Sequence, residues 1–360
     1  PGVLVDVCDS RGVYLGTGVY NPESMLTVRI LTRRRENIDG ELIRARVKAA
    51  LDYRRLLEQP DTDCRRLIFA EADRLPGVIA DQYADVIVMQ ILSFGMERFR
   101  RDIAEELISQ CRPACLILQH EEAVRAKEGL PLEREIYYCS APDSVDIMEN
   151  GIRLRIDLAG GQKTGYYLDQ KANHAAIRPF VRNKNVLDCF CYNGGFALNA
   201  AFGGAGAVTA IDISDIAIAA AKQNARLNNL ESRIKFKTAN VFDYLRQAVK
   251  DKELFDVIVL DPPAFAKNHA AKAAAVRGYK EINLSALKLL EPGGIMVTHS
   301  CSFHMSEALF VETVFEAARN ARRTVRVIDL RRQDRDHPVL AGYPESHYLK
   351  SLWLEVLDVG

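Results

Sequence analysis

Residues 185–196 read NVLDCFCYNGGF, and this stretch decides how the C-terminal half of the chain is expected to fold. An apolar run ends in a polar turn with two adjacent glycines, Gly194 and Gly195, and a helical sequence follows. Because glycine has no side chain, it lets the backbone come close to a ligand before the helix begins. The spacing is not G-x-G-x-x-G, which disfavours the pyrophosphate site of a nicotinamide dehydrogenase.

The same alternation continues to the C-terminus. Helical stretches at 214–229 and 306–320 lie between further apolar runs, which are AVTAIDI (207–213), RIKFKTA (233–239), FDVIVLDP (255–262) and GIMVTHS (294–300). Continuous apolar strands that alternate with helices predict an α/β fold with a parallel sheet covered on both faces. In such sheets ligands bind beyond the carboxyl ends of the strands.

The N-terminal half has a different pattern. Residues 1–36 contain three strand-like runs separated by Gly, Asn and Pro, which predicts a small β module. Residues 37–158 mix helices near 38–58 and 97–110 with strands at 66–71 and 85–92 and a hairpin turning at Asn150, which predicts an α+β domain.

We therefore predict three domains with boundaries at 1–36, 37–158 and 159–360. About thirty residues cannot close a β-barrel, so we expect the first half of the β module to precede Pro1.

Composition narrows the class of protein. No apolar run approaches the roughly 18 residues of a membrane span, so no membrane partner is expected. The 48 basic and 48 acidic residues give a net charge of +0, which neither indicates nor excludes nucleic acid. The eight cysteines contain no C-x-x-C pair, so we predict a reduced, cytoplasmic protein without a metal site.

Basic clusters are the local exception to this neutrality. Any one of them is most simply interpreted as solvated surface, and together they suggest phosphate contacts. The clusters lie at 33–35, 54–55, 65–66, 100–101, 322–323 and 331–332.

Polar residues stand at the end of every predicted C-terminal strand. Asp212 ends the second strand, where an acid can bind both hydroxyls of a ribose, and Asn240 follows the third, where it can meet an adenine edge. Asp261 ends the fourth strand, and Pro262 and Pro263 after it cannot continue a ladder and stiffen the loop. The fifth strand ends in HSCSF (299–303), which places Cys301 at the same edge.

The chain resembles the RlmI-like ribosomal RNA (cytosine-5) methyltransferases almost from end to end. These are class I, Rossmann-like enzymes with an N-terminal RNA-binding PUA domain and a middle domain. The matching segments are GVYNPES (18–24), VRIL (28–31), EADRLPGVIADQY (71–83), GGQKTGYYLDQ (160–170), CFCYNGGF, LDPPAF, RGYKEIN (277–283), SCS and HPVLAGYPESHYLK (337–350). The resemblance implies S-adenosylmethionine as cofactor and ribosomal RNA as partner. It places cofactor-binding residues at Lys163, Thr164, Tyr166, Gly194, Gly195, Asp212, Asn240, Asp261 and Pro262.

The same resemblance implies covalent catalysis by Cys301. Attack of a thiolate on carbon-6 of cytosine makes carbon-5 nucleophilic enough to accept a methyl group. Asp261 then either contacts the ring nitrogen-3 and amine or positions the cofactor loop, and both roles are open. Cys189 and Cys191, in the first turn, are expected to pack.

Two other interpretations remain open. Asp-Pro-Pro-aromatic loops also serve methylation of an exocyclic base nitrogen, which needs no cysteine, although here the aromatic Phe265 comes one residue late. An RNA-binding assembly factor with an inactive methyltransferase domain is the other, and the intact Gly194, Gly195, Asp212 and Asp261 argue against it.

Overall fold

A computed structural model describes residues 2–119, 122–132, 135–138, 142–158, 165–265 and 269–358 of the chain. The chain divides into two compact units. The first comprises Pro1–Gly151, Ile156–Leu168 and Arg335–Ser346, and the second comprises Ile152–Arg155, Asp169–Asp334 and His347–Gly360. The predicted boundaries at 36 and 158 remain predictions. Throughout the described residues, every helix is too short or too polar to span a bilayer.

The first unit contains two sheets. The predicted N-terminal strands are confirmed as an antiparallel three-stranded sheet of β1 (Val3–Cys8), β2 (Tyr14–Tyr20) and β3 (Val28–Thr32). A five-stranded sheet follows, in the order β4-β5-β6-β7-β8. Its strands are β4 (Cys64–Phe69), β5 (Val78–Tyr83), β6 (Val86–Ile91), β7 (Cys115–Leu118) and β8 (Glu135–Tyr138).

Helices complete this unit. The helix predicted over 38–58 is α1 (Gly40–Arg55), and it begins where the Asp39 carboxylate accepts from the backbone N–H of Leu42 at 3.1 Å. It packs on α3 (Arg100–Cys111) and on β4 over an apolar core. The shorter helices are α2 (Phe94–Glu97) and α4 (Glu122–Ala126).

Two of the predicted surface arginines are internal. Arg54 is 1 % exposed and lies 2.5 Å from Asp73, while Arg66 lies 2.8 Å from the fully buried Asp81. Burial of a charge is tolerated only when it is paired and hydrogen-bonded. The expectation of solvated surface or phosphate contact is therefore wrong for these two arginines, whereas Arg33, Arg34 and Arg35 are exposed.

A predicted hairpin joins the two halves of the sequence. Strand β9 (Ser144–Glu149) pairs with β10 (Ile152–Asp157). The two residues between them, Asn150 and Gly151, have φ angles of 49° and 77°. Positive φ at both positions is what a type I′ hairpin turn requires, so the Asn-Gly prediction is confirmed.

The second unit is the predicted α/β domain. Its seven-stranded sheet has the order β13-β12-β11-β14-β15-β17-β16. The first five strands in this order, from β13 to β15, are parallel to one another. Strand β17 is antiparallel to both β15 and β16. The strands are β11 (Asn185–Cys189), β12 (Ala207–Asp212), β13 (Ile234–Thr238), β14 (Phe255–Leu260), β15 (Leu290–Ser300), β16 (Thr324–Arg331) and β17 (Lys350–Leu357).

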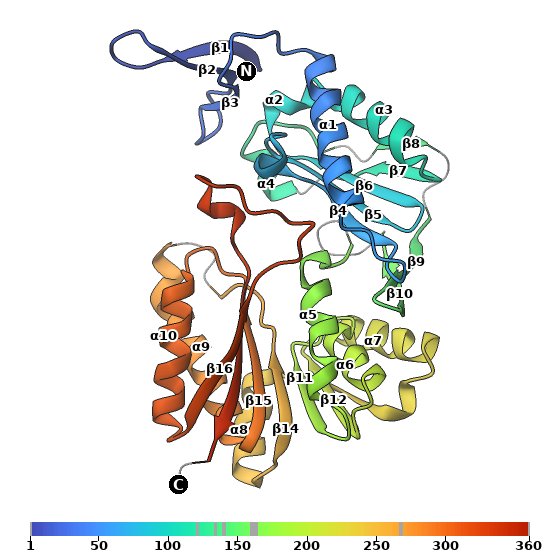
Figure 1. Ribbon diagram of the computed structural model, residues 1–360, viewed down its shortest axis with the longest axis vertical. Helices are drawn as coiled ribbons and strands as arrows, with labels where there is room; N and C mark the ends of the chain where they lie inside the picture. The colour runs from blue at the N-terminus through green and yellow to red at the C-terminus, as the bar shows by residue number, and fades with distance from the viewer. Residues whose placement is uncertain are drawn as a thin grey trace. The chain divides into compact units, whose positions relative to one another are not determined.

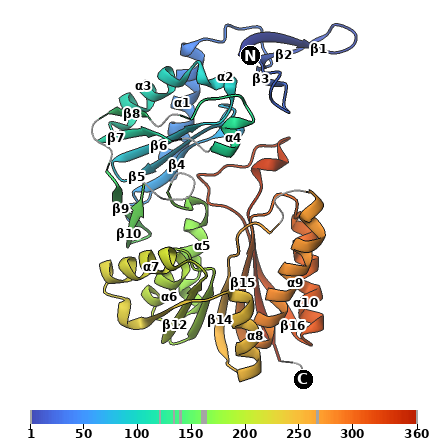
Figure 2. The ribbon, with the colours of Figure 1, turned by 180° about the vertical axis from the view of Figure 1, so that it is seen from behind.

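Helices cover both faces of this sheet (Figures 1 and 2). One face carries α5 (Lys171–Ala176), α6 (Gly195–Phe202) and α7 (Asp215–Leu227). The other carries α8 (Val241–Asp251), α9 (Lys272–Lys288) and α10 (Glu307–Asn320). Ser214 and Ser306 cap α7 and α10 with their side-chain oxygens, which fixes where each helix begins after its strand.

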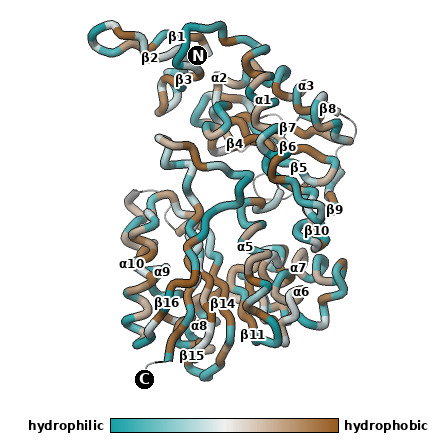
Figure 3. Tube along the Cα trace, in the orientation of Figure 1, coloured by the Kyte–Doolittle hydropathy of each residue, from teal (hydrophilic) through white to brown (hydrophobic). Residues whose placement is uncertain are grey.

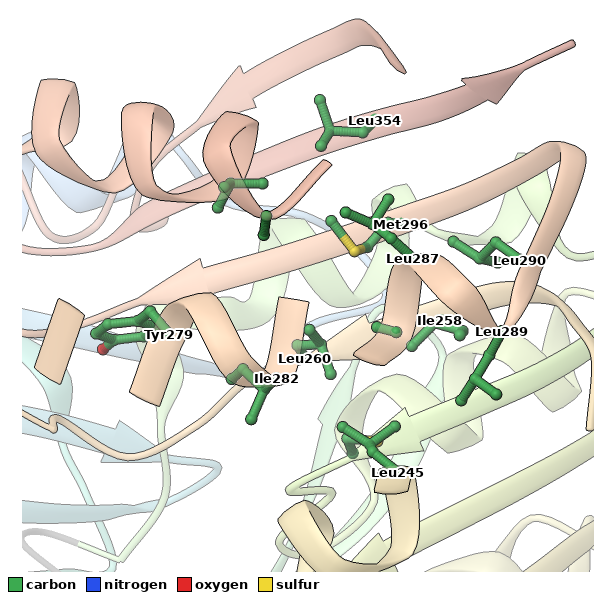
Figure 4. Close-up of a cluster of buried hydrophobic side chains, with 14 of the residues drawn as sticks. Leu245, Ile258, Leu260, Tyr279, Ile282, Leu287, Leu289, Leu290, Met296 and Leu354 are labelled. Atoms are coloured by element: carbon green, nitrogen blue, oxygen red, sulfur yellow. The ribbon is translucent and has the colours of Figure 1, made fainter. Parts of the chain in front are cut away.

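Apolar side chains hold α8, α9 and α10 against their face of the sheet. Figure 3 shows the central strands of the sheet as mostly brown. Figure 4 shows Leu287 of α9 beside Met296 of β15, and Leu260 and Leu354 belong to the same buried cluster. These four residues have at most 1 % exposure. Each contributes about 1.5–3 kcal/mol by leaving water. The carboxyl ends of the strands are thereby fixed in register.

Candidate active site

The sheet register brings the predicted site residues to one edge. Cys189 of β11 pairs with Leu260 of β14, and Leu260 pairs with Thr298 of β15. Asp261 is the residue directly after Leu260, and Cys301 is the third residue after Thr298. Strand order also reverses between β11 and β14, which is where ligands bind in open α/β sheets.

Asp212 is held rigidly at the end of β12. Its Oδ2 accepts from the backbone N–H of Tyr192 at 3.0 Å, and its Oδ1 accepts from that of Ser214 at 2.9 Å. Each carboxylate oxygen keeps a further lone pair, because an ionised carboxylate can accept about four hydrogen bonds. The side chain is therefore oriented in advance for a ligand that offers two hydroxyl donors.

The two glycines after β11 serve different purposes. Gly194 has a φ of 94° and precedes the first residue of α6, so a side chain there would be strained. Gly195 is needed for another reason, since a Cβ there would lie 2.4 Å from Cε1 of His174. At Gly195 it is the imidazole of α5 that approaches the backbone closely.

A buried acid lies beneath this turn. Asp188 of β11 is fully buried, and its Oδ2 accepts from the backbone N–H of Ala197 in α6 at 2.8 Å. Burial raises the pKa of Asp188 to about 8, although the Ala197 N–H opposes the rise, and the charge of Asp261 adds to it. Its Oδ1 has no hydrogen-bond partner within the described residues. An acceptor of this kind suits a positively charged ligand group.

Asp261 shares this environment. Burial raises the pKa of its carboxyl to about 7, with His174 opposing the shift and Asp169 adding to it. The backbone N–H of Asp261 donates to the carbonyl of Cys189 at 3.2 Å, which ties the Asp-Pro-Pro loop to β11. A carboxyl with this pKa is present in both protonation states near neutrality, so it can donate or accept a proton.

His299 is a neutral imidazole at the end of β15. It is fully buried, and burial lowers the pKa of its ring to about 3, with the nearby His174 lowering it further. The ring of Phe196 packs against both imidazoles, with its centroid 4.6 Å from that of His174 and 5.1 Å from that of His299. Neither nitrogen of His299 has a hydrogen-bond partner in the part of the chain described.

Two serines orient the segment that carries Cys301. The hydroxyl of Ser300 donates to the Tyr279 hydroxyl at 2.9 Å, and the same Tyr279 oxygen lies 3.0 Å from Oγ of Ser302. Both serines are fully buried, whereas Cys301 between them is partly exposed. The SCS sequence is therefore held on α9 through both serine hydroxyls, with the partly exposed Cys301 between them.

The remaining predicted residues have varied positions. The Asn240 Oδ1 accepts from the backbone N–H of Phe242 at 2.9 Å as the cap of α8, so this oxygen is already engaged. Pro262 is buried next to Asp261. Tyr166 belongs to the first unit, where its backbone N–H donates to the Tyr83 hydroxyl at 3.2 Å. Lys163 and Thr164 lie outside the described residues.

The loop aromatic, Phe265, is half-buried and packs against the hydrophobic core of the second unit. Its ring centroid lies 4.7 Å from that of Tyr279 and 5.8 Å from that of Phe242. A Cβ on Gly278 would lie 3.2 Å from the same ring. In this position the ring packs against α8 and α9.

Sequence reasoning missed three site residues, namely Asp188, His174 and His299. Asp188 and His299 were visible as ionisable residues at the ends of otherwise apolar strands, which is a recognisable sign of a functional site. His174 carries no such signal, because only the fold brings α5 against Gly195.

Comparison with known proteins identifies the family. Residues 101–335 match the family described as S-adenosylmethionine-dependent methyltransferase, and residues 1–33 match a PUA-like domain. The chain belongs to the S-adenosylmethionine-dependent methyltransferase family. The methyltransferase fold and the PUA-like N-terminus are thus confirmed, and S-adenosylmethionine is the cofactor of this methyltransferase.

Relatives of this methyltransferase match over nearly the full chain. A protein of Shewanella frigidimarina named Ribosomal RNA large subunit methyltransferase I is 42% identical over 98% of this chain and 89% of its own length. A protein of the same name from Klebsiella pneumoniae is 42% identical over 99% of this chain and 90% of its own length. The resemblance drawn from the sequence is therefore confirmed.

Solved structures support the fold of the methyltransferase. A protein of Streptococcus mutans described as a SAM-dependent methyltransferase is 21% identical and superposes with a TM-score of 0.86, covering 99% of this chain and 92% of its own. A methyltransferase structure complexed with SAH is 22% identical, with a TM-score of 0.87 and the same coverage. Likeness at this identity shows the fold alone.

Proposed function

We propose that this methyltransferase methylates carbon-5 of a cytosine in large-subunit ribosomal RNA through a covalent adduct with Cys301. The observation that carries the proposal is the placement of Cys301, which is partly exposed between two buried serines held by Tyr279. It lies one strand away from Asp261 at the ligand-binding edge of the sheet. The name shared by its relatives supports ribosomal RNA as the substrate.

The residues at this edge fit S-adenosylmethionine. The two fixed oxygens of Asp212 suit the ribose hydroxyls. The Oδ1 of Asp188 has no partner within the described residues, and in the ionised carboxylate it suits the ammonium of the methionine part. Gly194, Gly195, Asn240 and Pro262 complete the assignment on this unit, and Lys163, Thr164 and Tyr166 remain predicted cofactor residues. When bound, S-adenosylmethionine supplies the electrophilic methyl group.

The chain's own residues perform the remaining chemistry. The Cys301 thiolate forms a bond to carbon-6, and the displaced ring electrons reach nitrogen-3 as the Asp261 carboxyl delivers its proton there. Carbon-5 becomes nucleophilic and accepts the methyl group. After carbon-5 loses its proton to a base, the bond between Sγ and carbon-6 breaks, nitrogen-3 returns its proton, and the thiolate is restored. The pKa of about 7 suits Asp261 to both proton transfers.

The packing of Phe265 disfavours methylation of an exocyclic nitrogen. In that reaction the loop aromatic would have to stack on the target base. The half-buried Phe265 instead packs against Tyr279 and Phe242, and Cys301 would have no role in that reaction. The family match and the intact Asp212 likewise disfavour an assembly factor without activity.

The test is methylation of ribosomal RNA in vitro, followed by digestion to nucleosides and mass spectrometry. We expect 5-methylcytidine from the wild-type protein and none from Cys301→Ala. Cys189→Ala and Cys191→Ala are matched controls, because both thiols are buried and burial raises the pKa of each well above its usual value. Both controls should methylate normally. A methyl group on a cytosine or adenine nitrogen would overturn the proposal.

A further inference from the structure

A buried lysine lies behind the SCS segment. Lys350 is the first residue of β17 and is 3 % exposed. It pairs with Ser300 in the antiparallel ladder between β15 and β17. Its Nζ donates to the carbonyl oxygen of Ser302 at 2.8 Å and to that of Tyr348 at 2.8 Å. The ammonium group is thus anchored to the residue directly after Cys301.

The anchoring restricts what this ammonium can do. Two of its three N–H groups are directed to backbone carbonyls, and burial keeps it away from any RNA base. Burial lowers the pKa of Lys350 to about 8, while the charge of a Cys301 thiolate and that of Glu307 raise it. Electrostatic coupling between two titrating groups is reciprocal, so the lysine charge favours the thiolate as much as the thiolate favours the ammonium.

The other ionisable groups near Lys350 are compatible with a charged lysine. Glu307, from the first turn of α10, favours the ammonium and lies 3.6 Å from Nε2 of His347. Tyr279, from α9, is neutral near pH 7, because burial raises its pKa to about 12. Lys350 is therefore a cationic group coupled to Cys301.

We propose that Lys350 is a positioning residue whose buried ammonium stabilises the thiolate of Cys301 and so raises the fraction of active nucleophile. The inference rests on the proposed function for its relevance to methylation. In the step it affects, the Cys301 thiol releases its proton to solvent and the lysine keeps its own. An unperturbed thiol would be only about 3% ionised at pH 7, so such stabilisation has a large effect on rate.

The test measures alkylation of Cys301 by iodoacetamide as a function of pH, read by mass spectrometry of the peptide that contains it. In the wild-type protein the rate should reach half its maximum below about pH 8.5. In Lys350→Met the half-point should rise by about one pH unit. Alkylation at pH 7 should then be about tenfold slower and at pH 10 unchanged. A purely structural role would change the rate at every pH.

Three further variants complete the comparison. Lys350→Arg keeps the charge and should retain the wild-type profile. Lys280→Met removes the charge of a more exposed lysine 2.5 Å from Glu316 and should leave the profile unchanged. Lys350→Gln removes the charge while keeping an N–H donor, and it replaces the methionine variant if that protein does not fold.

A wild-type half-point at or above pH 8.5 would overturn the inference, as would superimposable profiles for the wild type and a folded neutral variant. Alkylation requires neither RNA nor cofactor, so this result is separate from the proposed function. If Cys301→Ala still methylates RNA, the proposed function fails while the alkylation profiles still decide the role of Lys350.

Discussion

Asp212→Ala should weaken binding of S-adenosylmethionine by about 1.5–3 kcal/mol, the range for hydrogen bonds to a charged group. The carboxylate is already held by the N–H groups of Tyr192 and Ser214 at 3.0 and 2.9 Å. Ligand binding therefore does not have to order this side chain, and no loss of conformational entropy is subtracted from the hydrogen bonds it makes. Since about 1.4 kcal/mol is a factor of ten, the dissociation constant should rise by roughly 10- to 150-fold. Calorimetric titration of the purified protein measures this directly.

Asp215→Ala is the matched control for this prediction. Asp215 is an exposed acid in the first turn of α7, three residues further along the same edge. Its removal costs about 0.3–1 kcal/mol of stability through the helix dipole and should leave the affinity within about twofold of wild type. Equal affinities for Asp212→Ala, Asp215→Ala and the wild type would refute the assignment of the ribose site.

Other predictions concern pH, charge and salt. Burial raises the pKa of Asp188 to about 8. Between about pH 4 and 8 the folded, ligand-free protein therefore keeps a proton on Asp188 that the unfolded chain has lost. The contribution of Asp188 to the free energy of unfolding then falls as pH rises through this range. Asp188→Asn should therefore raise the melting temperature more at pH 8 than at pH 5, and equal shifts would contradict this. Arg54→Met should cost about 3–5 kcal/mol in urea unfolding by leaving Asp73 buried without its partner, and a loss under about 1 kcal/mol would show the pair to be dispensable. Replacing the exposed Arg33, Arg34 and Arg35 with alanine should make RNA binding less sensitive to salt. In a plot of the logarithm of the binding constant against the logarithm of salt concentration, the slope should become shallower by about 0.7–0.9 for each lost phosphate contact. An unchanged slope would show that these arginines do not contact phosphate.

The sheet of the second unit was predictable because its strands are continuous apolar runs between helices. The same pattern placed Asp212, Asp261 and Cys301 at one edge, since parallel strands end together. Strand β5 escaped prediction because Asp81 interrupts its apolar sequence. Asp81 is tolerated there only because Arg66 lies directly opposite it on β4. Such a cross-strand pair is invisible until the register is known.

The partners of the site residues could not be predicted either. Gly195 was expected to admit a ligand, and the imidazole of His174 occupies the space that a side chain would need. Likewise, the serines around Cys301 share the Tyr279 hydroxyl, which α9 brings to both of them. Sequence periodicity indicates which face of an element is buried. It does not show which polar atoms meet there.

The most direct test of the covalent mechanism uses RNA in which the target cytidine is replaced by 5-fluorocytidine. Fluorine at carbon-5 leaves no proton to remove, so an adduct that has accepted the methyl group cannot release the enzyme. With S-adenosylmethionine present, the wild-type protein should form a complex with this RNA that survives denaturing electrophoresis. Cys301→Ala should form none while still binding the cofactor, and Cys301→Ser should be nearly as inactive, because a hydroxyl without a dedicated base is a weaker nucleophile than a thiolate. A denaturation-resistant complex with Cys301→Ala, or none with an active wild-type protein, would contradict the mechanism.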